Sequence, residues 1–194
     1  MQFNKNTSSG KINIVRLVVK TILGLAVFLC LVFLGMMGSG KSSIGLLIAK
    51  KLGLDFVDVD REIEKELGLS IKKIFETKGE DYFRKYEEKI TLKKLKLTSA
   101  VISLGGGAFT SRNVRKEVLK SNISFWLDWN DKILLNRIKN SKKRPLAFNS
   151  TDNELINLIR KRSNIYSKAL YKIKCDDLSK NELVNKILKI YETH

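Results

Sequence analysis

Short apolar runs alternate along the chain with longer segments in which apolar and charged residues recur every three or four positions. Buried strands of a parallel sheet are continuous apolar runs, and the helices that cover such a sheet are apolar on one face only. The runs predict strands at 28–34, 56–59, 100–104, 123–127 and 171–175. Strands that alternate with helices in this way predict a three-layer α/β fold, with a five-stranded parallel sheet flanked by helices.

The helices are predicted between these strands. We place them at 42–52, across the charged region 61–96, at 110–120, at 131–140, over a long segment after 150 and at 180–191. Gly68 and Gly79 are expected to break the charged region, because glycine is a poor helix former. Ser70, Thr110 and Asn130 are candidate N-caps, since their side-chain oxygens accept hydrogen bonds from the first turn of a helix.

The start of the chain is basic and then apolar, which is typical of a signal peptide or a membrane anchor. The apolar segment outside the first strand, 12–27, is only 16 residues long and is interrupted by Arg16 and Lys20. A membrane-spanning helix needs about 20 apolar residues. We therefore expect 1–27 to be a partly helical extension and 28–194 to form one domain. A membrane-facing role of the extension is the alternative left open.

The composition argues against several kinds of catalytic and structural site, and it says less about binding partners. The 194 residues include 37 Lys+Arg against 20 Asp+Glu, which gives a formal net charge of +17. The bases are scattered and lack the interleaved aromatic residues of a nucleic-acid stacking surface, so we expect small anionic ligands and no nucleic acid. The one histidine is His194, and the two cysteines are Cys30 and Cys175. This set argues against a disulfide framework, a zinc site and a Ser-His-Asp triad.

A glycine-rich motif follows the first strand directly. Residues 35–42 read Gly-Met-Met-Gly-Ser-Gly-Lys-Ser, which satisfies the pattern G-x-x-x-x-G-K-[ST]. In this pattern backbone N–H groups surround phosphates, Lys41 reaches the β- and γ-phosphates, and Ser42 can bind Mg²⁺. The motif predicts a phosphate-binding NTPase or kinase. Its ATP-binding residues would be Gly38, Ser39, Gly40, Lys41, Ser42 and Ser43.

Two carboxylates end the second predicted strand. Asp58 and Asp60 are two positions apart, so a strand would point both to one face, beside the ligand crevice of an open α/β sheet. Asp58 suits a metal-bound water, and Asp60 suits a hydroxyl group that must be oriented. The residues alone leave a second interpretation open, in which Asp60 caps the helix that starts at Arg61.

Glycines and arginines complete the candidate chemistry. Residues 105–107 are three glycines directly after a buried strand, and they leave room for a ligand where a turn would need only one. Arg144 precedes the only proline, in a polar segment at 141–152 that is long enough to close over ATP as a lid. A lone arginine is usually a solvated surface charge, and this applies to three others taken singly: Arg84, Arg137 and Arg162.

Together these segments resemble shikimate kinase, a small P-loop enzyme related to the nucleoside monophosphate kinases. The resemblance runs from Leu29 to Tyr191 and rests on six motifs in the same order and spacing. They are Phe33-Leu-Gly-Met-Met-Gly-Ser-Gly-Lys-Ser42, Asp58-Val-Asp60-Arg-Glu-Ile-Glu64, Phe83-Arg84-x-x-Glu87, Ile102-Ser-Leu-Gly-Gly-Gly-Ala108, Arg144-Pro-Leu146 and Arg162-x-x-x-Tyr166. Gluconate kinases and adenylate kinases share the first motif but lack the combination of the next three.

The resemblance implies a role for each matched residue. Asp60 would hold the shikimate hydroxyls and accept the proton of the 3-hydroxyl, while Lys41 and Arg144 would complete the catalytic set. Mg²⁺ would be held by Ser42 and Asp58, and Arg137 and Arg144 would contact ATP. The shikimate site would consist of Asp60, Arg84, Gly105, Gly106, Gly107 and Arg162. In it the two arginines would clamp the carboxylate through paired hydrogen bonds, with Glu87 orienting them. Residues 174–182 fall where the family surrounds adenine.

We therefore expect a cytoplasmic, monomeric shikimate kinase that uses ATP and Mg²⁺ to phosphorylate the 3-hydroxyl of shikimate, on the route to chorismate and the aromatic amino acids. The substrate-binding region is expected at about 60–97 and the lid at about 141–152. Two alternatives stay open: a P-loop kinase of another polyol acid such as gluconate, and a membrane-associated or nucleic-acid-binding P-loop module. The third strand ends without a Walker B aspartate, so the metal would depend on Ser42 and Asp58.

Overall fold

The structure, a computed structural model, describes residues 29–97, 99–140 and 150–194. The predictions for the extension at 1–27, for Arg144 and for most of the lid lie outside these residues. Among the helices that the structure describes, none is long and apolar enough to cross a membrane. The other matched motifs all lie within the described part of the chain.

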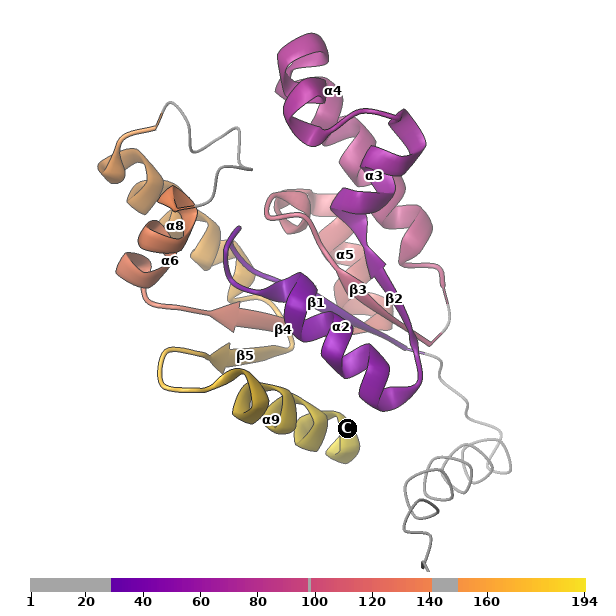
Figure 1. Cartoon of the computed structure of the whole chain (residues 1–194). Coiled ribbons are helices and arrows are strands. Elements are labelled where there is room, and N and C mark those ends of the chain that lie inside the picture. The colour runs from indigo at the N-terminus through magenta and orange to yellow at the C-terminus, as the bar shows by residue number, and fades with distance from the viewer. Residues whose placement is uncertain (1–28, 98, 141–149) are drawn as a thin grey trace, which may run out of the picture.

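Five parallel strands form the central sheet of the described domain (Figure 1). In chain order they are β1 (Cys30–Leu34), β2 (Asp55–Asp58), β3 (Ala100–Ser103), β4 (Asn122–Asp128) and β5 (Tyr171–Lys174). Their order across the sheet is β2-β3-β1-β4-β5, and every neighbouring pair is parallel. The predicted five-stranded parallel sheet is confirmed, and the strand that precedes the glycine-rich motif lies in its middle.

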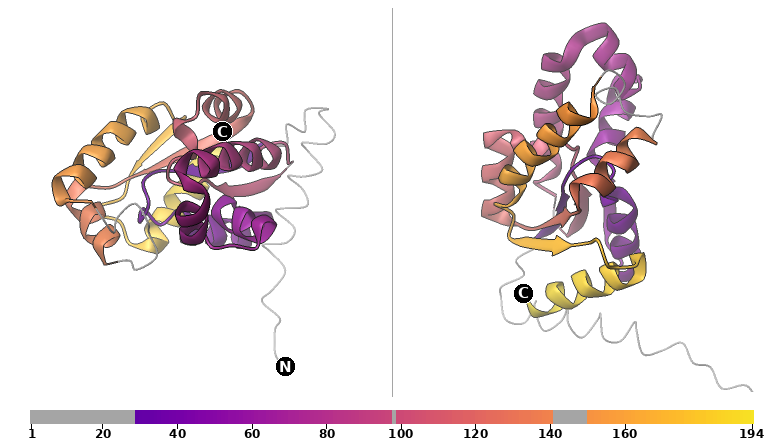
Figure 2. Two further views of the ribbon diagram at one scale, coloured as in Figure 1. Left: turned by 90° about the horizontal axis from the view of Figure 1, so that it is seen from above. Right: turned by 90° about the vertical axis from the view of Figure 1, so that its left-hand side faces the viewer.

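Helices flank this sheet on both sides. Those described are α2 (Lys41–Leu52), α3 (Val59–Leu67), α4 (Ile71–Lys94), α5 (Arg112–Ser121), α6 (Asp131–Lys139), α8 (Asp152–Tyr166) and α9 (Lys180–Thr193), with a 3₁₀ turn η1 (Ala108–Thr110). Figure 2 shows α2 and α5 on opposite sides of the strands. Helices α3 and α4 extend beyond the end of the sheet, at the top of Figure 1, and form the helical region expected at about 60–97.

The inner strands β1, β3 and β4 are buried on both faces, so the side chains of the sheet build two cores. On β1, Cys30, Val32 and Leu34 belong to a core that includes side chains of α4, α5 and α8. Leu31 and Phe33 belong to a second core with side chains of α2 and α9. This alternation follows from the two-residue period of a strand. Burial on both faces explains why the strand is a continuous apolar run in the sequence.

Two of the three predicted caps are confirmed. Ser70 caps α4 and Asn130 caps α6, each accepting a hydrogen bond from a backbone N–H of the first turn. The prediction that Thr110 caps the next helix is wrong, because Ser111 is the N-cap of α5. Thr110 lies in the preceding 3₁₀ turn, where its hydroxyl donates to the carbonyl of Gly107 at 2.6 Å.

The two glycines expected to break the charged region do so in different ways. Gly68 ends α3 in the left-handed conformation, with a φ of 65°. Gly79 lies inside α4, with a φ of 79° and a ψ of 171°, and kinks that helix. A β-carbon disfavours both φ values, so glycine is needed at each bend. The kink at Gly79 sets the direction of the helical segment that carries Arg84.

Helix α2 approaches the sheet closely at Gly45. A β-carbon at this position would lie 2.9 Å from Cε2 of Phe56 and 3.5 Å from side-chain atoms of both Phe33 and Val101. Because real β-carbons essentially never come closer than 3.0 Å to such atoms, the missing side chain is what lets α2 pack at this depth. The closeness with which α2 packs on the sheet in turn determines the position of the loop that connects α2 to β1.

Replacing Gly45 with valine should destabilise the protein by about 1–3 kcal/mol, because the added side chain must displace the Phe56 ring in a packed core. Urea unfolding followed by circular dichroism measures this loss. The matched control is Leu46→Val on the exposed side of the same helix, where Leu46 is 40% exposed. The control should cost less than about 1 kcal/mol. Equal stability of the two variants would show that α2 is not closely packed at Gly45.

Candidate active site

A cavity of about 800 Å³ opens beyond the carboxyl ends of β1, β2 and β3. Residues 35–42, here called the phosphate loop, meet α3, α4 and α8 around it. Open α/β sheets bind ligands at this edge, so the cavity lies where the sequence predicted the crevice. The predicted site residues that line it are Gly38, Gly40, Lys41, Ser42, Ser43, Asp60, Arg84, Gly106, Gly107 and Arg162.

The phosphate loop has the backbone conformation that its glycines permit. Gly35, Gly38 and Gly40 have φ values of 140°, 85° and 88°, which side chains rarely adopt. Lys41 folds back over the loop, and its Nζ donates to the carbonyl of Gly35 at 2.9 Å and to that of Met36 at 3.0 Å. The loop therefore brings an ammonium group, backbone N–H groups and the N-terminus of α2 together, which is an arrangement that binds phosphate.

Asp58 ends β2 and caps the next helix, whereas Asp60 lies inside that helix, so the prediction that both aspartates end the strand and point to one face is wrong. The Oδ1 atom of Asp58 accepts hydrogen bonds from the backbone N–H groups of Asp60 at 3.1 Å and Arg61 at 3.4 Å. The alternative interpretation, in which Asp60 is the cap, is wrong because α3 begins at Val59. The side chain of Asp60 is thereby left to face the cavity.

The oxygen donors near the phosphate loop fit a hard cation such as Mg²⁺, which takes most of its ligands from water and from substrate phosphates. The described residues contain no group of three or more His, Cys, Asp or Glu side chains that could hold a metal ion. The hydroxyl oxygens of Ser42 and Ser103 lie 3.4 Å apart, and both residues line the cavity. Mg²⁺ usually keeps several waters and binds substrate phosphates, so a hydroxyl with one nearby carboxylate is sufficient for it.

The three glycines after β3 leave room for charged side chains. A β-carbon on Gly105 would overlap the carboxylate of Glu87 and lie 2.7 Å from Oδ1 of Asp60. A β-carbon on Gly107 would overlap the guanidinium group of Arg84. The middle glycine is crowded by the phosphate loop, since its β-carbon would lie 3.2 Å from a backbone nitrogen there. The triplet is therefore needed to bring these groups and the loop together.

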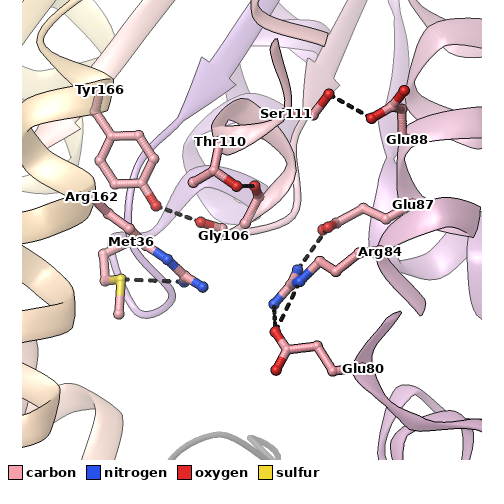
Figure 3. A network of polar contacts seen from close by, with 11 residues as sticks. Met36, Glu80, Arg84, Glu87, Glu88, Gly106, Thr110, Ser111, Arg162 and Tyr166 are labelled. Atoms are coloured by element: carbon pink, nitrogen blue, oxygen red, sulfur yellow. Dashed lines mark hydrogen bonds and ion pairs between the residues drawn. The ribbon is translucent and has the colours of Figure 1, made fainter. Parts of the chain in front are cut away.

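Arg84 is held by two carboxylates of its own helix (Figure 3). Its Nη1 donates to Glu87 at 2.7 Å, and its Nε and Nη2 donate to Oε1 of Glu80 at 3.1 and 2.9 Å. Burial alone would lower the pKa of Arg84, but the two carboxylates outweigh burial and raise that pKa. The guanidinium group is thus charged and fixed in orientation.

Two carboxyl groups near Arg84 have pKa values above their ordinary range. Burial, and after it the charges of Glu87 and Asp58, raise the pKa of Asp60 to about 7, although Lys41 and Arg84 oppose the shift. Burial also raises the pKa of Glu87, against the attraction of the neighbouring guanidinium groups. A cavity carboxyl group that titrates near neutral pH is suited to accept a proton from a bound hydroxyl.

Arg162 of α8 faces Arg84 across the cavity (Figure 3). It is only 8% exposed, and its Nη1 lies 3.7 Å from Sδ of Met36. One turn further along, the hydroxyl of Tyr166 donates to the carbonyl of Gly106, and burial raises the pKa of Tyr166 to about 12. Among the ion pairs of the described residues none involves Arg162. A buried guanidinium group in this state favours the binding of an anion.

The cavity as a whole is positively charged. Its lining includes four basic side chains, Lys41, Lys72, Arg84 and Arg162, and three acidic ones, Asp60, Glu64 and Glu87. Aromatic and aliphatic side chains from α4 add an apolar wall. This combination suits a small anion with an apolar ring next to a phosphorylated ligand.

Some predicted residues of the described chain do not line the cavity. Ser39, within the phosphate loop, is only 1% exposed, and Asp58 is engaged at the start of α3. Gly105 is covered by the carboxylates beside it. Arg137 lies over the ring of Trp129, with its Cζ 3.7 Å from the ring centroid.

The segment 174–182, which was expected near adenine, makes local contacts. Glu182 forms a capping box with Ser179 at the start of α9. Asp176 accepts a hydrogen bond from the backbone N–H of Asn130 at 2.7 Å. These contacts account for Asp176, Ser179 and Glu182 without a ligand, and the position of the segment beside adenine stays a prediction.

Several functional contacts were missed in the sequence. Glu80 precedes Arg84 by four residues on a helix, and this spacing could have indicated the ion pair. Phe75 follows Ile71 by the same interval, which could have indicated an apolar wall of the cavity. The contacts of Met36 and Trp129 join distant parts of the chain, and no local sequence pattern predicts them.

Known proteins resemble the chain over most of its length. A family model described as shikimate kinase matches residues 37–192. A shikimate kinase of Persephonella marina is 42% identical over 155 residues, which cover 79% of this chain and 93% of that protein. The solved structure of a shikimate kinase from Acinetobacter baumannii in complex with shikimate aligns with a TM-score of 0.81 at 30% identity, over 86% of this chain and 94% of that one. A shikimate kinase from Aquifex aeolicus aligns with a TM-score of 0.76 at 37% identity, over 84% and 96% of the two chains.

Asp60→Asn should stabilise the ligand-free protein above neutral pH. The folded-state pKa of Asp60 is about 7 against an ordinary value of 3.8, so the folded state binds more protons and loses stability as the pH rises from about 4 through about 7. The variant should exceed the wild type in unfolding free energy by at least about 1 kcal/mol at pH 8. The excess should vanish at pH 4.

Urea unfolding at several pH values checks this result. The control is Asp55→Asn, an exposed change at the start of β2, the strand that precedes α3, which should leave the pH dependence as in the wild type. A pH-independent effect of Asp60→Asn would contradict the raised pKa.

Proposed function

The chain belongs to the shikimate kinase family, and we propose that its cavity transfers the γ-phosphoryl group of ATP to the 3-hydroxyl of shikimate. The products would be shikimate 3-phosphate and ADP. The cytoplasm supplies ATP, and we place the reaction there, in a monomer. The observation that carries the proposal is the pair of guanidinium groups, Arg84 and Arg162, facing each other beside the glycine triplet and next to a phosphate loop.

The two arginines are assigned to the carboxylate of shikimate. A planar guanidinium group offers parallel N–H donors that match the two oxygens of a carboxylate. Arg84 is oriented in advance by Glu80 and Glu87, so little side-chain entropy would be lost on binding. Arg162 is buried and outside every ion pair found in the described chain, so an incoming carboxylate would compensate its charge.

Asp60 is assigned to the 3-hydroxyl of shikimate. It lies beside the glycine triplet, between the arginine side of the cavity and the phosphate loop. With a pKa raised to about 7, its carboxylate can orient the hydroxyl and accept its proton when the phosphoryl group is transferred. Gly105, Gly106 and Gly107 supply the space and the backbone against which the ring would lie.

The phosphate loop is assigned to ATP. Residues 38–42 of the loop and Ser43 of α2 would surround the phosphates, and Lys41 would release its two loop carbonyls to contact the transferring group. Arg144, which lies outside the described residues, is proposed as the lid arginine, and Arg137 as a contact of the base. Catalysis of this kind depends on positioning and charge stabilisation, which requires no histidine.

Mg²⁺ is proposed as the accompanying cation. Ser42 would bind it directly and Asp58 through water, consistent with a donor set that is too small to hold the ion alone. When bound, Mg²⁺ would neutralise charge that develops on the phosphates. The carboxylate of Asp58 is fixed by its bonds to the first turn of α3.

An ATP-dependent assay with shikimate tests the proposal. The full chain should release ADP with shikimate and Mg²⁺ at least about 100 times faster than with gluconate, because gluconate lacks a rigid ring to fill the space beside the glycine triplet. Lys41→Ala should remove the activity and keep the circular dichroism spectrum. Phosphorylation of gluconate in preference to shikimate would overturn the assignment.

Arg84→Ala and Arg162→Ala should each lower kcat/KM for shikimate about 100-fold or more, because charge-assisted hydrogen bonds to the substrate carboxylate are lost. The KM for ATP should change less than about 3-fold, since neither residue belongs to the phosphate loop. The Lys variants keep the charge but not the paired donors, and they should recover only part of the loss. Equal weakening toward both substrates would argue against a carboxylate clamp.

A further inference from the structure

We propose that Trp129 is a positioning residue of the phosphate loop. Its indole N–H fixes the peptide unit between Ser39 and Gly40, so that the N–H of Gly40 faces the bound phosphates. The inference rests on the proposed function only in taking residues 35–42 as the loop that binds the phosphates of ATP.

The contact joins two neighbouring strands of the sheet. Trp129 directly follows β4, and β4 is paired with β1, the strand that leads into the phosphate loop. The Nε1 atom of Trp129 donates to the carbonyl of Ser39 at 2.9 Å, across 90 positions of the chain. A side chain outside the glycine-rich motif thus forms a hydrogen bond with the backbone of the loop.

The orientation of this peptide unit matters for anion binding. In a trans peptide the C=O and the N–H point in opposite directions, so a carbonyl held by Trp129 turns the N–H of Gly40 the other way. Gly40 lines the cavity, whereas Ser39 is 1% exposed. The N–H that is directed away from the indole therefore belongs to the residue on the cavity side.

The loop itself does not determine that orientation. Gly38 and Gly40 flank Ser39 with φ values of 85° and 88°, and glycine adopts other φ values at little cost. Without an external bond, the peptide between Ser39 and Gly40 could rotate and present its carbonyl to the phosphates. The hydrogen bond from Trp129 removes this freedom before the ligand arrives, which lowers the cost of binding.

The indole is held in place from its other side. The guanidinium group of Arg137, from α6, lies over the ring, with Cζ 3.7 Å from the centroid. Such cation–π contacts contribute on the order of 0.5–1 kcal/mol at exposed sites. Arg137 and Ser39 together fix the ring and its N–H, so Trp129 is a rigid link and not a mobile cover.

The test uses Trp129→Phe in the full chain, because phenylalanine keeps an aromatic ring for Arg137 and removes the N–H donor. Calorimetry measures the affinity for ADP and for inorganic tripolyphosphate, both with Mg²⁺. Both affinities should fall by a similar factor, about 3- to 10-fold, since tripolyphosphate has no base and senses the loop alone. The KM for shikimate should stay as in the wild type.

The matched control is Tyr171→Phe, which also removes one polar group from an aromatic side chain. The hydroxyl of Tyr171 is hydrogen-bonded to His194 at 2.9 Å, outside the cavity. This control should leave both phosphate affinities unchanged. If Trp129→Phe does not fold, hydrogen exchange of the Trp129 indole N–H in the wild type replaces the variant, and strong protection is expected.

Three results would overturn the inference: unchanged affinity for tripolyphosphate, an equal loss of affinity for shikimate, or fast exchange of the indole N–H. A wild-type chain that binds tripolyphosphate but does not phosphorylate shikimate would instead contradict the proposed function. The two failures are therefore distinguishable.

Discussion

The site depends on oppositely charged side chains that pack directly against three glycines. Side chains at Gly105 and Gly107 would collide with the carboxylate of Glu87 and the guanidinium group of Arg84. Buried charges are costly unless they are paired and hydrogen-bonded, so Glu87 and Arg84 are stabilised by lying close together. Burial, and after it the charges of Glu87 and Asp58, raises the pKa of Asp60, and the lining of the cavity keeps a surplus of positive charge.

The sheet brings the two halves of the site together. Its middle strand, β1, leads into the phosphate loop, and its neighbour β3 leads into the glycine triplet. Met36 links the halves directly, because its carbonyl accepts a hydrogen bond from Lys41 and its sulfur contacts Arg162. Tyr166 joins α8, the helix that carries Arg162, to the glycine triplet through its bond to Gly106. Under the proposed function, these contacts hold the phosphoryl donor and the acceptor in a fixed relation.

Local patterns in the sequence predicted the strands and helices, and together with the family resemblance they predicted ten of the twenty described residues that line the cavity. All five strands were predicted; the apolar pattern is continuous for β1 and β3, which are buried at every position, whereas the edge strands β2 and β5 keep polar and exposed positions. The cap at Thr110 was wrong because a 3₁₀ turn shifts the helix start by one residue, which the sequence does not encode clearly. The contact of Trp129 with Ser39 depends on strand order, so only the folded chain reveals it.

The central claim is that two guanidinium groups recognise a carboxylate beside the phosphate loop. Its most direct test compares shikimate with shikimate methyl ester as acceptors for the full chain, ATP and Mg²⁺. The ester keeps the ring and the 3-hydroxyl but has no negative charge. The account predicts that kcat/KM falls about 100-fold or more for the ester, since charge-assisted hydrogen bonds to both arginines are lost. Equal use of the acid and the ester would contradict it.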